Sequence, residues 1–255
     1  MTVSQLYAYL NSKIPSALSC DWDNDGLMCA PDPEKEVKRV LVTLDITAEA
    51  IEKAISEGCE VILSHHPLIF KGLKSVTQDS CVSAKVIDLI KSGIAAFSFH
   101  TRLDALEGGV NDVLAETLGV KDTVPFGIDG ETIGRVGTID APTSLDSFAK
   151  AVRDKLGAPA VLCADAGKEV RRVALLGGSG GDDIAAAIAS GADTYVSGRL
   201  GYHEMTDAAE LGINLIEAGH FYTEYPVCEK LEALVKEADG EIECVRFFSN
   251  KIRMI

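Results

Sequence analysis

The chain has 255 residues, of which 47% are hydrophobic and 25% are charged, so it can bury a substantial core and is too apolar to be mainly disordered. Its 39 acidic residues outnumber its 24 basic residues, and the net charge of -15 disfavours binding to nucleic-acid backbones or anionic membranes without a local basic patch. No stretch reaches the roughly 18 uninterrupted apolar residues of a membrane span. The seven cysteines contain no Cys-x-x-Cys pair, so we expect a cytoplasmic protein with reduced thiols.

Apolar runs of strand length alternate with helical patterns in the first part of the chain. Residues 40–44 predict a buried strand, and a helix follows over about 48–56. A second strand is predicted at 61–63, then a helix at 83–91 and a third strand at 94–99. Alternation of this kind predicts an α/β fold with a largely parallel sheet.

The most informative feature is an internal repeat. Residues 39–64 align without a gap with residues 172–197, and seven of these 26 positions are identical. Both segments predict a strand, a helix, a glycine stop and a second strand, a pattern that unrelated βαβ units also share. The matching His-x-x-x-carboxylate motif that follows in each half favours true duplication. We therefore expect two intertwined, duplicated α/β lobes with mixed, largely parallel sheets, one over 1–125 and one over 126–255.

Six potential metal ligands follow the ends of predicted strands. They are four imidazoles and two carboxylates: His65, His66, His100, Asp104, His220 and Glu224. Because ligands collect at the carboxyl ends of parallel strands, we expect these side chains to converge. Imidazole is the commonest transition-metal ligand, and carboxylates complete or bridge such sites. Six donors give about three per ion for two ions, which leaves positions open for water, as in catalytic sites.

Each of these motifs has a plainer interpretation when it is taken alone. A single buried histidine is more often a hydrogen-bonded core residue than a ligand. Successive strand residues also point to opposite faces, so His65 and His66 share a site only if the strand ends there. Pro67 indicates such an end, because proline cannot continue a central ladder. The prediction of a metal centre therefore rests on the three motifs occurring together.

The second copy of the repeat offers further candidates. Arg199 stands where the first copy has His66. His203, a few residues on, is either a general acid or base beside the metals or a helix-start histidine without a chemical role. The glycine run 177–181 either cradles an anion or makes a tight turn, and it is not a Walker loop because no lysine follows in register.

The segment 21–27 contains the only tryptophan, Trp22, among several acidic residues. A calcium loop is not supported, because the bidentate glutamate at the twelfth position is missing. We interpret the segment as a turn that places Trp22 near the mouth of the pocket, where it can contact a substrate.

These motifs together resemble the YbgI-like family, homologs of GTP cyclohydrolase 1 type 2, over nearly the whole chain. The resemblance is carried by Trp22-Asp23-Asn24-Asp25-Gly26-Leu27, Ser64-His65-His66-Pro67, His100-Thr101-Arg102-Leu103-Asp104 and Gly219-His220-Phe221-Tyr222-Thr223-Glu224. It implies two divalent transition-metal ions (Zn, Fe, Mn or Co) at the six ligands named above. It also implies a homohexamer, a trimer of dimers, with sites facing an internal cavity. Relatives often have Gly-Asp where this chain has Gly198-Arg199, and a guanidinium there is suited to bind substrate phosphate.

The expected function is that of a metal-dependent hydrolase, whose two ions activate a bridging water for attack on a small molecule. The resemblance implies an activity like that of GTP cyclohydrolase type 2, with a nucleotide as substrate. The alternative is a non-enzymatic, ring-forming scaffold or regulatory protein that binds metal. Nucleic-acid binding conflicts with the net charge of -15 unless the interior of the expected hexameric ring is locally basic.

Overall fold

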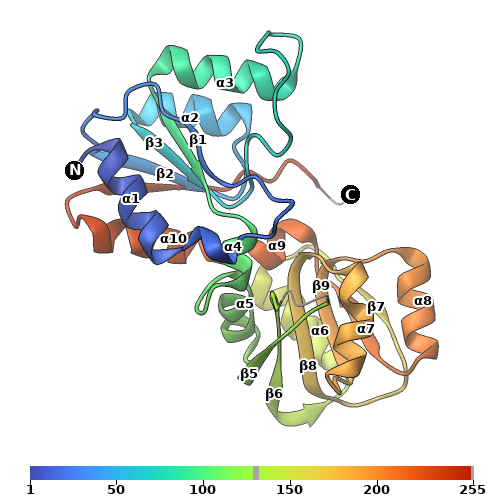
Figure 1. The fold of residues 1–255 in the computed structure, drawn as a ribbon. Coiled ribbons are helices and arrows are strands. Elements are labelled where there is room, and N and C mark those ends of the chain that lie inside the picture. Colours follow the sequence, from blue (N-terminus) through green and yellow to red (C-terminus); the bar gives the residue numbers. More distant parts are fainter. Residues whose placement is uncertain (129–131, 254–255) are drawn as a thin grey trace. The chain divides into compact units, whose positions relative to one another are not determined.

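The computed structural model describes residues 1–128 and 132–253, and the chain forms two compact units (Figure 1). The first unit combines Met1–Leu103 with Cys228–Lys251, and the second is built mainly from Asp104–Val227. This division differs from the expected lobes 1–125 and 126–255. The reason is that the C-terminal segment returns to the first unit, where β11 (Glu243–Phe247) pairs in parallel with β2 (Arg39–Thr43).

The first unit contains a five-stranded sheet in the order β1-β4-β3-β2-β11. Its remaining strands are β1 (Gly26–Cys29), β3 (Val61–Ser64) and β4 (Ala95–Ser98). Only the β1–β4 pair is antiparallel, and the other three pairs are parallel. The carboxyl ends of β2, β3 and β4 therefore share one edge of the sheet.

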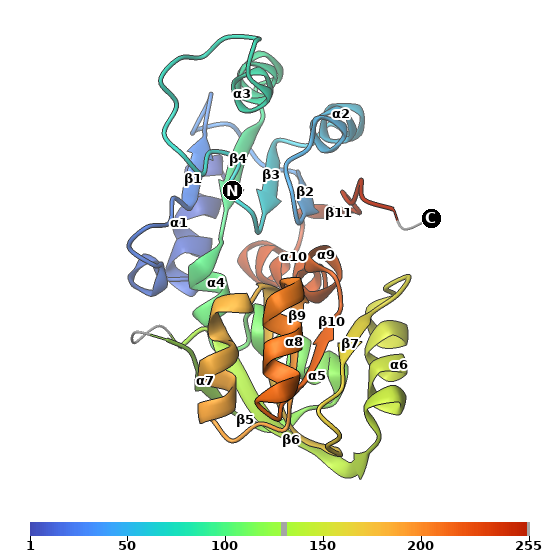
Figure 2. The same cartoon turned by 90° about the vertical axis from the view of Figure 1, so that its right-hand side faces the viewer.

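Helices cover both faces of this sheet, as Figure 2 shows. On one face lie α2 (Ala48–Glu57) and α3 (Cys81–Ser92), and on the other lie α1 (Val3–Lys13) and α10 (Val227–Ala238). Two short helices, η1 (Ser16–Leu18) and α4 (Thr101–Ala105), lie between the longer elements in sequence. Side chains alternate along the strands: Leu41 and Ile62 pack in the core under α2 and α3. The helix α2 begins where Thr47 accepts a hydrogen bond from the amide of Ala50, and it ends at the left-handed Gly58.

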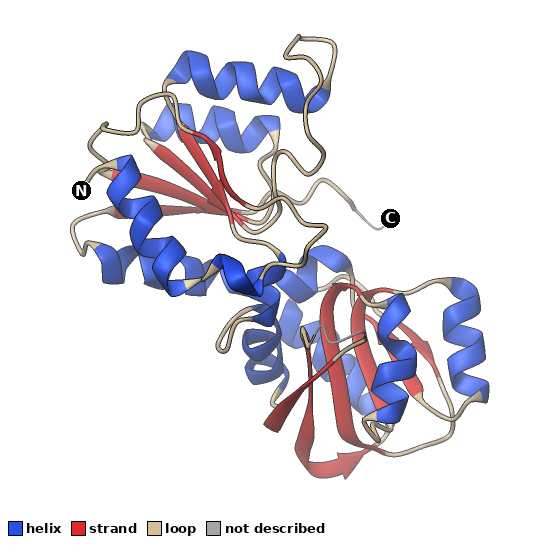
Figure 3. Ribbon diagram, in the orientation of Figure 1, coloured by secondary structure: helices blue, strands red, loops and turns tan. Residues whose placement is uncertain are grey.

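The second unit contains a six-stranded sheet in the order β5-β6-β8-β9-β10-β7, seen among the red strands of Figure 3. Its strands are β5 (Lys121–Phe126), β6 (Gly134–Thr143), β7 (Leu162–Ala164), β8 (Val170–Ser179), β9 (Thr194–Arg199) and β10 (Asn214–Glu217). The central β8-β9-β10 strands are parallel, and the flanking pairs are antiparallel. The expected predominance of parallel pairs thus holds for the first sheet, and the second sheet is parallel only at its centre.

Two separate cores hold the helices of the second unit against its sheet. One lies under α5 (Val110–Leu118) and α6 (Leu145–Leu156), and the other lies under α7 (Ile184–Ala189) and α8 (Tyr202–Glu210). The short helices are η2 (Gly181–Asp183) and α9 (His220–Glu224). Among the described residues, none of the helices combines the length and apolar composition that crossing a bilayer requires.

The two units repeat the same hydrogen bonds at positions related by the internal repeat. The amide of Glu60 donates to the carbonyl of Arg39 at 3.0 Å, and the amide of Asp193 donates to the carbonyl of Arg172 at 3.0 Å. The carboxylates of Glu60 and Asp193 in turn accept from the amides of Arg39 and Arg172, at 2.9 and 2.7 Å. Such matched local detail supports duplication, and the expected mixed α/β fold is confirmed.

Candidate metal centre

Three imidazole rings meet in the first unit, at the edge where its parallel strands end. His65 and His66 follow β3, and His100 follows β4. The ring centroids lie 5.0 Å apart for His65 and His66, 5.2 Å for His65 and His100, and 5.8 Å for His66 and His100. One potential ligand nitrogen of each ring lies within 4.8 Å of the other two. The strand has ended before His66, so the two adjacent histidines face the same site.

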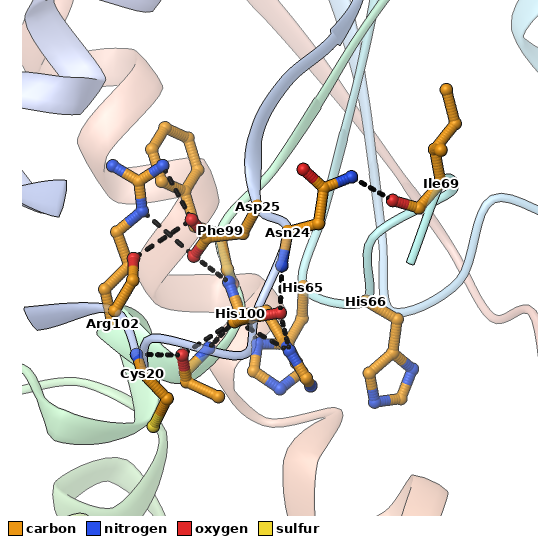
Figure 4. A network of polar contacts seen from close by, with 12 residues as sticks. Cys20, Asn24, Asp25, His65, His66, Ile69, Phe99, His100 and Arg102 are labelled. Atoms are coloured by element: carbon orange, nitrogen blue, oxygen red, sulfur yellow. Dashed lines mark hydrogen bonds and ion pairs between the residues drawn. The ribbon is translucent and has the colours of Figure 1, made fainter. Parts of the chain in front are cut away.

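Each ring is fixed through its Nδ1 atom by a hydrogen-bond acceptor. His65 Nδ1 lies 2.9 Å from the carbonyl oxygen of Phe99. His66 Nδ1 lies 2.7 Å from Asp45 Oδ1, and His100 Nδ1 lies 2.9 Å from Asp23 Oδ1 (Figure 4 shows the three histidines). Carbonyl and carboxylate oxygens only accept, so each Nδ1 must carry the proton and donate it.

This donor set fits a transition-metal ion. An imidazole that carries its single proton at Nδ1 keeps the lone pair of its Nε2 atom for a metal. Metal-ligating histidines characteristically donate their other ring nitrogen to a carboxylate or a backbone carbonyl in this way. Three such rings at one edge can hold an ion without rearranging their own supports.

Asp23 is the most tightly held of the supporting acids. Its side chain is fully buried and accepts from His100 Nδ1, from the amide of Thr101 and from the hydroxyl of Thr101. Burial raises the pKa of Asp23, but the hydrogen bonds from His100 and Thr101 outweigh burial and hold this pKa well below its ordinary value. Asp23 is therefore a charged acceptor that fixes the orientation of His100.

A second buried acid, Asp25, supports the same strand end. Its Oδ2 atom accepts from the amide of His100 at 3.1 Å and from Arg102 Nε at 3.0 Å (Figure 4). Arg102 is only 2% exposed, and its Nη1 atom also donates to Asn11 Oδ1 at 2.8 Å and to the carbonyl of Ile14 at 3.0 Å. The network fixes the backbone from which His100 projects.

In the second unit, His220 and Glu224 lie one turn apart on α9. His220 Nε2 is 3.1 Å from Glu224 Oε2, and Glu224 is only 4% exposed. The packing of α9 depends on glycines: a Cβ atom at Gly198 would lie 2.7 Å from His220 Cα and 2.6 Å from Thr223 Oγ1. Gly198 occupies the position that His65 occupies in the first copy. The second copy therefore has a glycine at the position of this histidine, and the absence of a side chain leaves room for α9.

Replacing Gly198 by alanine is expected to destabilise the protein by roughly 1–3 kcal/mol, because the added methyl group overpacks a site bounded by backbone atoms. The matched control is Gly240→Ala, since a Cβ atom at Gly240 meets nothing within 4 Å. Urea denaturation of both variants measures the difference in the free energy of unfolding. Equal stability of the two variants would show that α9 tolerates displacement from β9.

The other predicted residues lie as follows. Asp104 is buried in α4. Trp22 contacts His100 edge-on, with ring centroids 6.4 Å apart, so it borders the histidines. Arg199 is exposed at the end of β9, and His203 is exposed on α8, where its ring contacts Tyr202.

The glycine run 177–181 is explained by close packing. A Cβ atom at Gly178 would lie 2.2 Å from Glu224 Oε1, one at Gly180 would lie 2.1 Å from the hydroxyl of Tyr195, and one at Gly181 would lie 2.2 Å from Glu204 Oε2. Side chains thus occupy the space beside these glycines, which leaves the anion-cradle interpretation without support from the structure.

The supports Asp23, Asp25 and Asp45 were not selected from the sequence as parts of the site. Asp45 follows β2 directly, so the strand-end argument that identified the histidines could have found it. Asp23 and Asp25 lie in a loop before an antiparallel strand, and no periodicity connects them to His100.

Comparison with known proteins gives consistent results. A match to the Duf34/NIF3 (NGG1p interacting factor 3) family covers residues 1–252. A Clostridium perfringens protein named GTP cyclohydrolase 1 type 2 homolog is 34% identical over 253 residues, covering 96% of this chain and 95% of the relative. The crystal structure of Staphylococcus aureus hypothetical protein SA1388 has a TM-score of 0.91 at 28% identity and covers 100% of this chain and 99% of its own. The structure of protein ybgI has a TM-score of 0.88 at 24% identity over 98% of this chain and 99% of its own, a likeness of fold.

Proposed function

This chain belongs to the Duf34/NIF3 family, and we propose that it is a metal-dependent hydrolase acting on a small molecule. The membership, together with relatives named GTP cyclohydrolase 1 type 2 homolog, confirms the family resemblance expected from the sequence motifs. The observation that carries the proposal is the convergence of three imidazoles, each fixed at Nδ1 by an oxygen acceptor. Neutral imidazoles oriented in this way are prepared to bind metal.

The proposed ligands are the six residues selected from the sequence. We propose that two divalent ions bind at His65, His66, His100, Asp104, His220 and Glu224. Such ions supply Lewis acidity that polarises a substrate oxygen and lowers the pKa of a water. The proximity of two proposed ligands on α9 supports the assignment, because His220 Nε2 lies 3.1 Å from the buried Glu224 Oε2. Imidazole and carboxylate donors suit Zn, Fe, Mn and Co alike.

The finer parts of the proposal come from the family resemblance and from the names of the relatives. Ring-opening hydrolysis of a nucleotide such as GTP is the specific reaction proposed, with Arg199 as a candidate contact for phosphate. The proposed setting is a cytoplasmic homohexamer assembled as a trimer of dimers.

The test begins with metal analysis of protein purified without chelator. Protein loaded with Mn, Fe, Co or Zn is then screened against nucleotides and against generic esters, phosphoesters and amides. Turnover that a chelator abolishes and added metal restores is the expected result. Absence of turnover at full metal occupancy would instead favour the ring-forming scaffold.

A further inference from the structure

Two exposed aromatic rings border the histidine triad. Trp22 is 58% exposed and Phe70 is 44% exposed, and their ring centroids lie 6.2 Å apart at an interplanar angle of 68°. Both rings meet His100 edge-on, with centroid distances of 6.4 Å for Trp22 and 6.2 Å for Phe70. Large aromatic surfaces next to a candidate metal centre remain in water unless something covers them, and covering them is favourable.

The two aromatic rings are carried by loops that are fastened to each other and to the triad. Asn24 Nδ2 donates a hydrogen bond to the carbonyl oxygen of Ile69, which joins the loop of Trp22 to the loop of Phe70 (Figure 4). Asp23, next to Trp22, accepts from Thr101 and from His100 Nδ1. The positions of both aromatic rings are therefore fixed relative to His100.

We propose that Trp22 and Phe70 form an aromatic platform for a planar heteroaromatic ring of the substrate, which stacks on the face of one ring and meets the edge of the other. This inference rests on the proposed function, because it assigns the ring to the molecule that reacts at the triad. Stacking on aromatic side chains recognises the flat face of a ring and tolerates differences between rings, since every base has a π-face. A ring on this platform lies beside His100, so its oxygen substituents can face the metal ligands.

The platform distinguishes substrates by a physical criterion. Molecules with a planar ring gain apolar contact with Trp22 and Phe70, whereas sugar phosphates and aliphatic esters do not. The chain thereby selects for ring-containing substrates without any hydrogen-bond code for a particular base.

Trp22 is the only tryptophan in the chain, so its fluorescence reports on this platform alone. Titration of the metal-loaded protein with guanosine or adenosine 5′-monophosphate should quench the emission saturably, and ribose 5-phosphate should not. Phe70→Ala should weaken nucleotide binding by about 5- to 150-fold, the range found when an aromatic stacking partner is removed. The matched control is Ile90→Ala, which truncates a 53% exposed apolar side chain on α3 and should leave binding unchanged.

The outcomes separate this inference from the proposed function. Quenching by nucleotides that Phe70→Ala weakens supports the platform, whether or not the screen finds a reaction. Metal-dependent hydrolysis with no quenching, or with equal binding of ribose 5-phosphate, overturns the platform and leaves the hydrolase proposal standing. Emission that changes with protein concentration but not with nucleotide also overturns it, because a second copy of the chain would then cover Trp22.

Discussion

Replacing His66 by alanine is expected to lower metal affinity by more than about 100-fold, because the change removes a ligand, whereas losing an outer hydrogen-bond partner typically costs roughly 10- to 100-fold. Asp45→Asn should fall in that smaller range, since Asp45 lies outside the proposed ligand set and holds the Nδ1 atom of His66. Metal content by mass spectrometry, and competition with a chromophoric chelator, measure both affinities. Any hydrolytic activity should fall more in His66→Ala than in Asp45→Asn.

The fifth histidine provides the matched control for this series. His203 is exposed on α8 outside the proposed ligand set, so His203→Ala should keep the metal content of the unmodified protein. Lost turnover with full metal content in this variant would assign His203 the acid-base role considered from the sequence. Full metal content in His66→Ala, by contrast, would remove His66 from the ligand set.

Replacing Arg102 by methionine should destabilise the protein by roughly 3–5 kcal/mol, because removal of one partner leaves the other charge buried and uncompensated. Arg102 is 2% exposed and its Nη2 atom lies 3.0 Å from Asp25 Oδ1, whose side chain is also buried. The change also removes the hydrogen-bond donor that Arg102 supplies to Asn11 Oδ1 and to the carbonyl of Ile14. Equilibrium denaturation measures the loss.

Two further variants test the assignment of this loss to the buried pair. Arg246→Met removes an arginine that is half-exposed and paired with Glu232, so it should cost far less. The double variant Arg102→Met with Asp25→Asn should lose less stability than the sum of the single changes, because no unpaired charge remains. Strict additivity would contradict a buried ion pair. Weakened metal binding in Arg102→Met would show that Asp25 transmits the change to His100.

The sequence contains enough information to predict the histidine triad. His65, His66 and His100 follow short apolar runs, and parallel strands bring such positions to one edge of a sheet. The repeat also predicted that two related units share the chain, because strand, helix and glycine stop recur in register. Local periodicity determines these features, so they can be found from the sequence alone.

Features that depend on distant segments could not be predicted in this way. The pairing of β11 with β2 joins residues separated by about two hundred positions, and nothing in the periodicity of either strand identifies its neighbour. Asp23 reaches His100 across 77 positions, from a loop that reads as an ordinary acidic turn. The close packing of the glycine run 177–181 is also hidden in the sequence. The side chains that pack against these glycines belong to other elements, so the run alone indicates only a turn or an anion cradle.

The return of the C-terminus has a consequence for how the protein is made. Until β11 leaves the ribosome, β2 is an edge strand with unpaired backbone groups, although Thr43 and Phe247, 204 positions apart, are hydrogen-bonded in the finished unit. The second unit is nearly continuous in sequence and can fold during synthesis, whereas the first must wait for the last strand. A premature stop before residue 243 would therefore remove β11 from the N-terminal sheet. The unpaired edge of β2 would then promote aggregation.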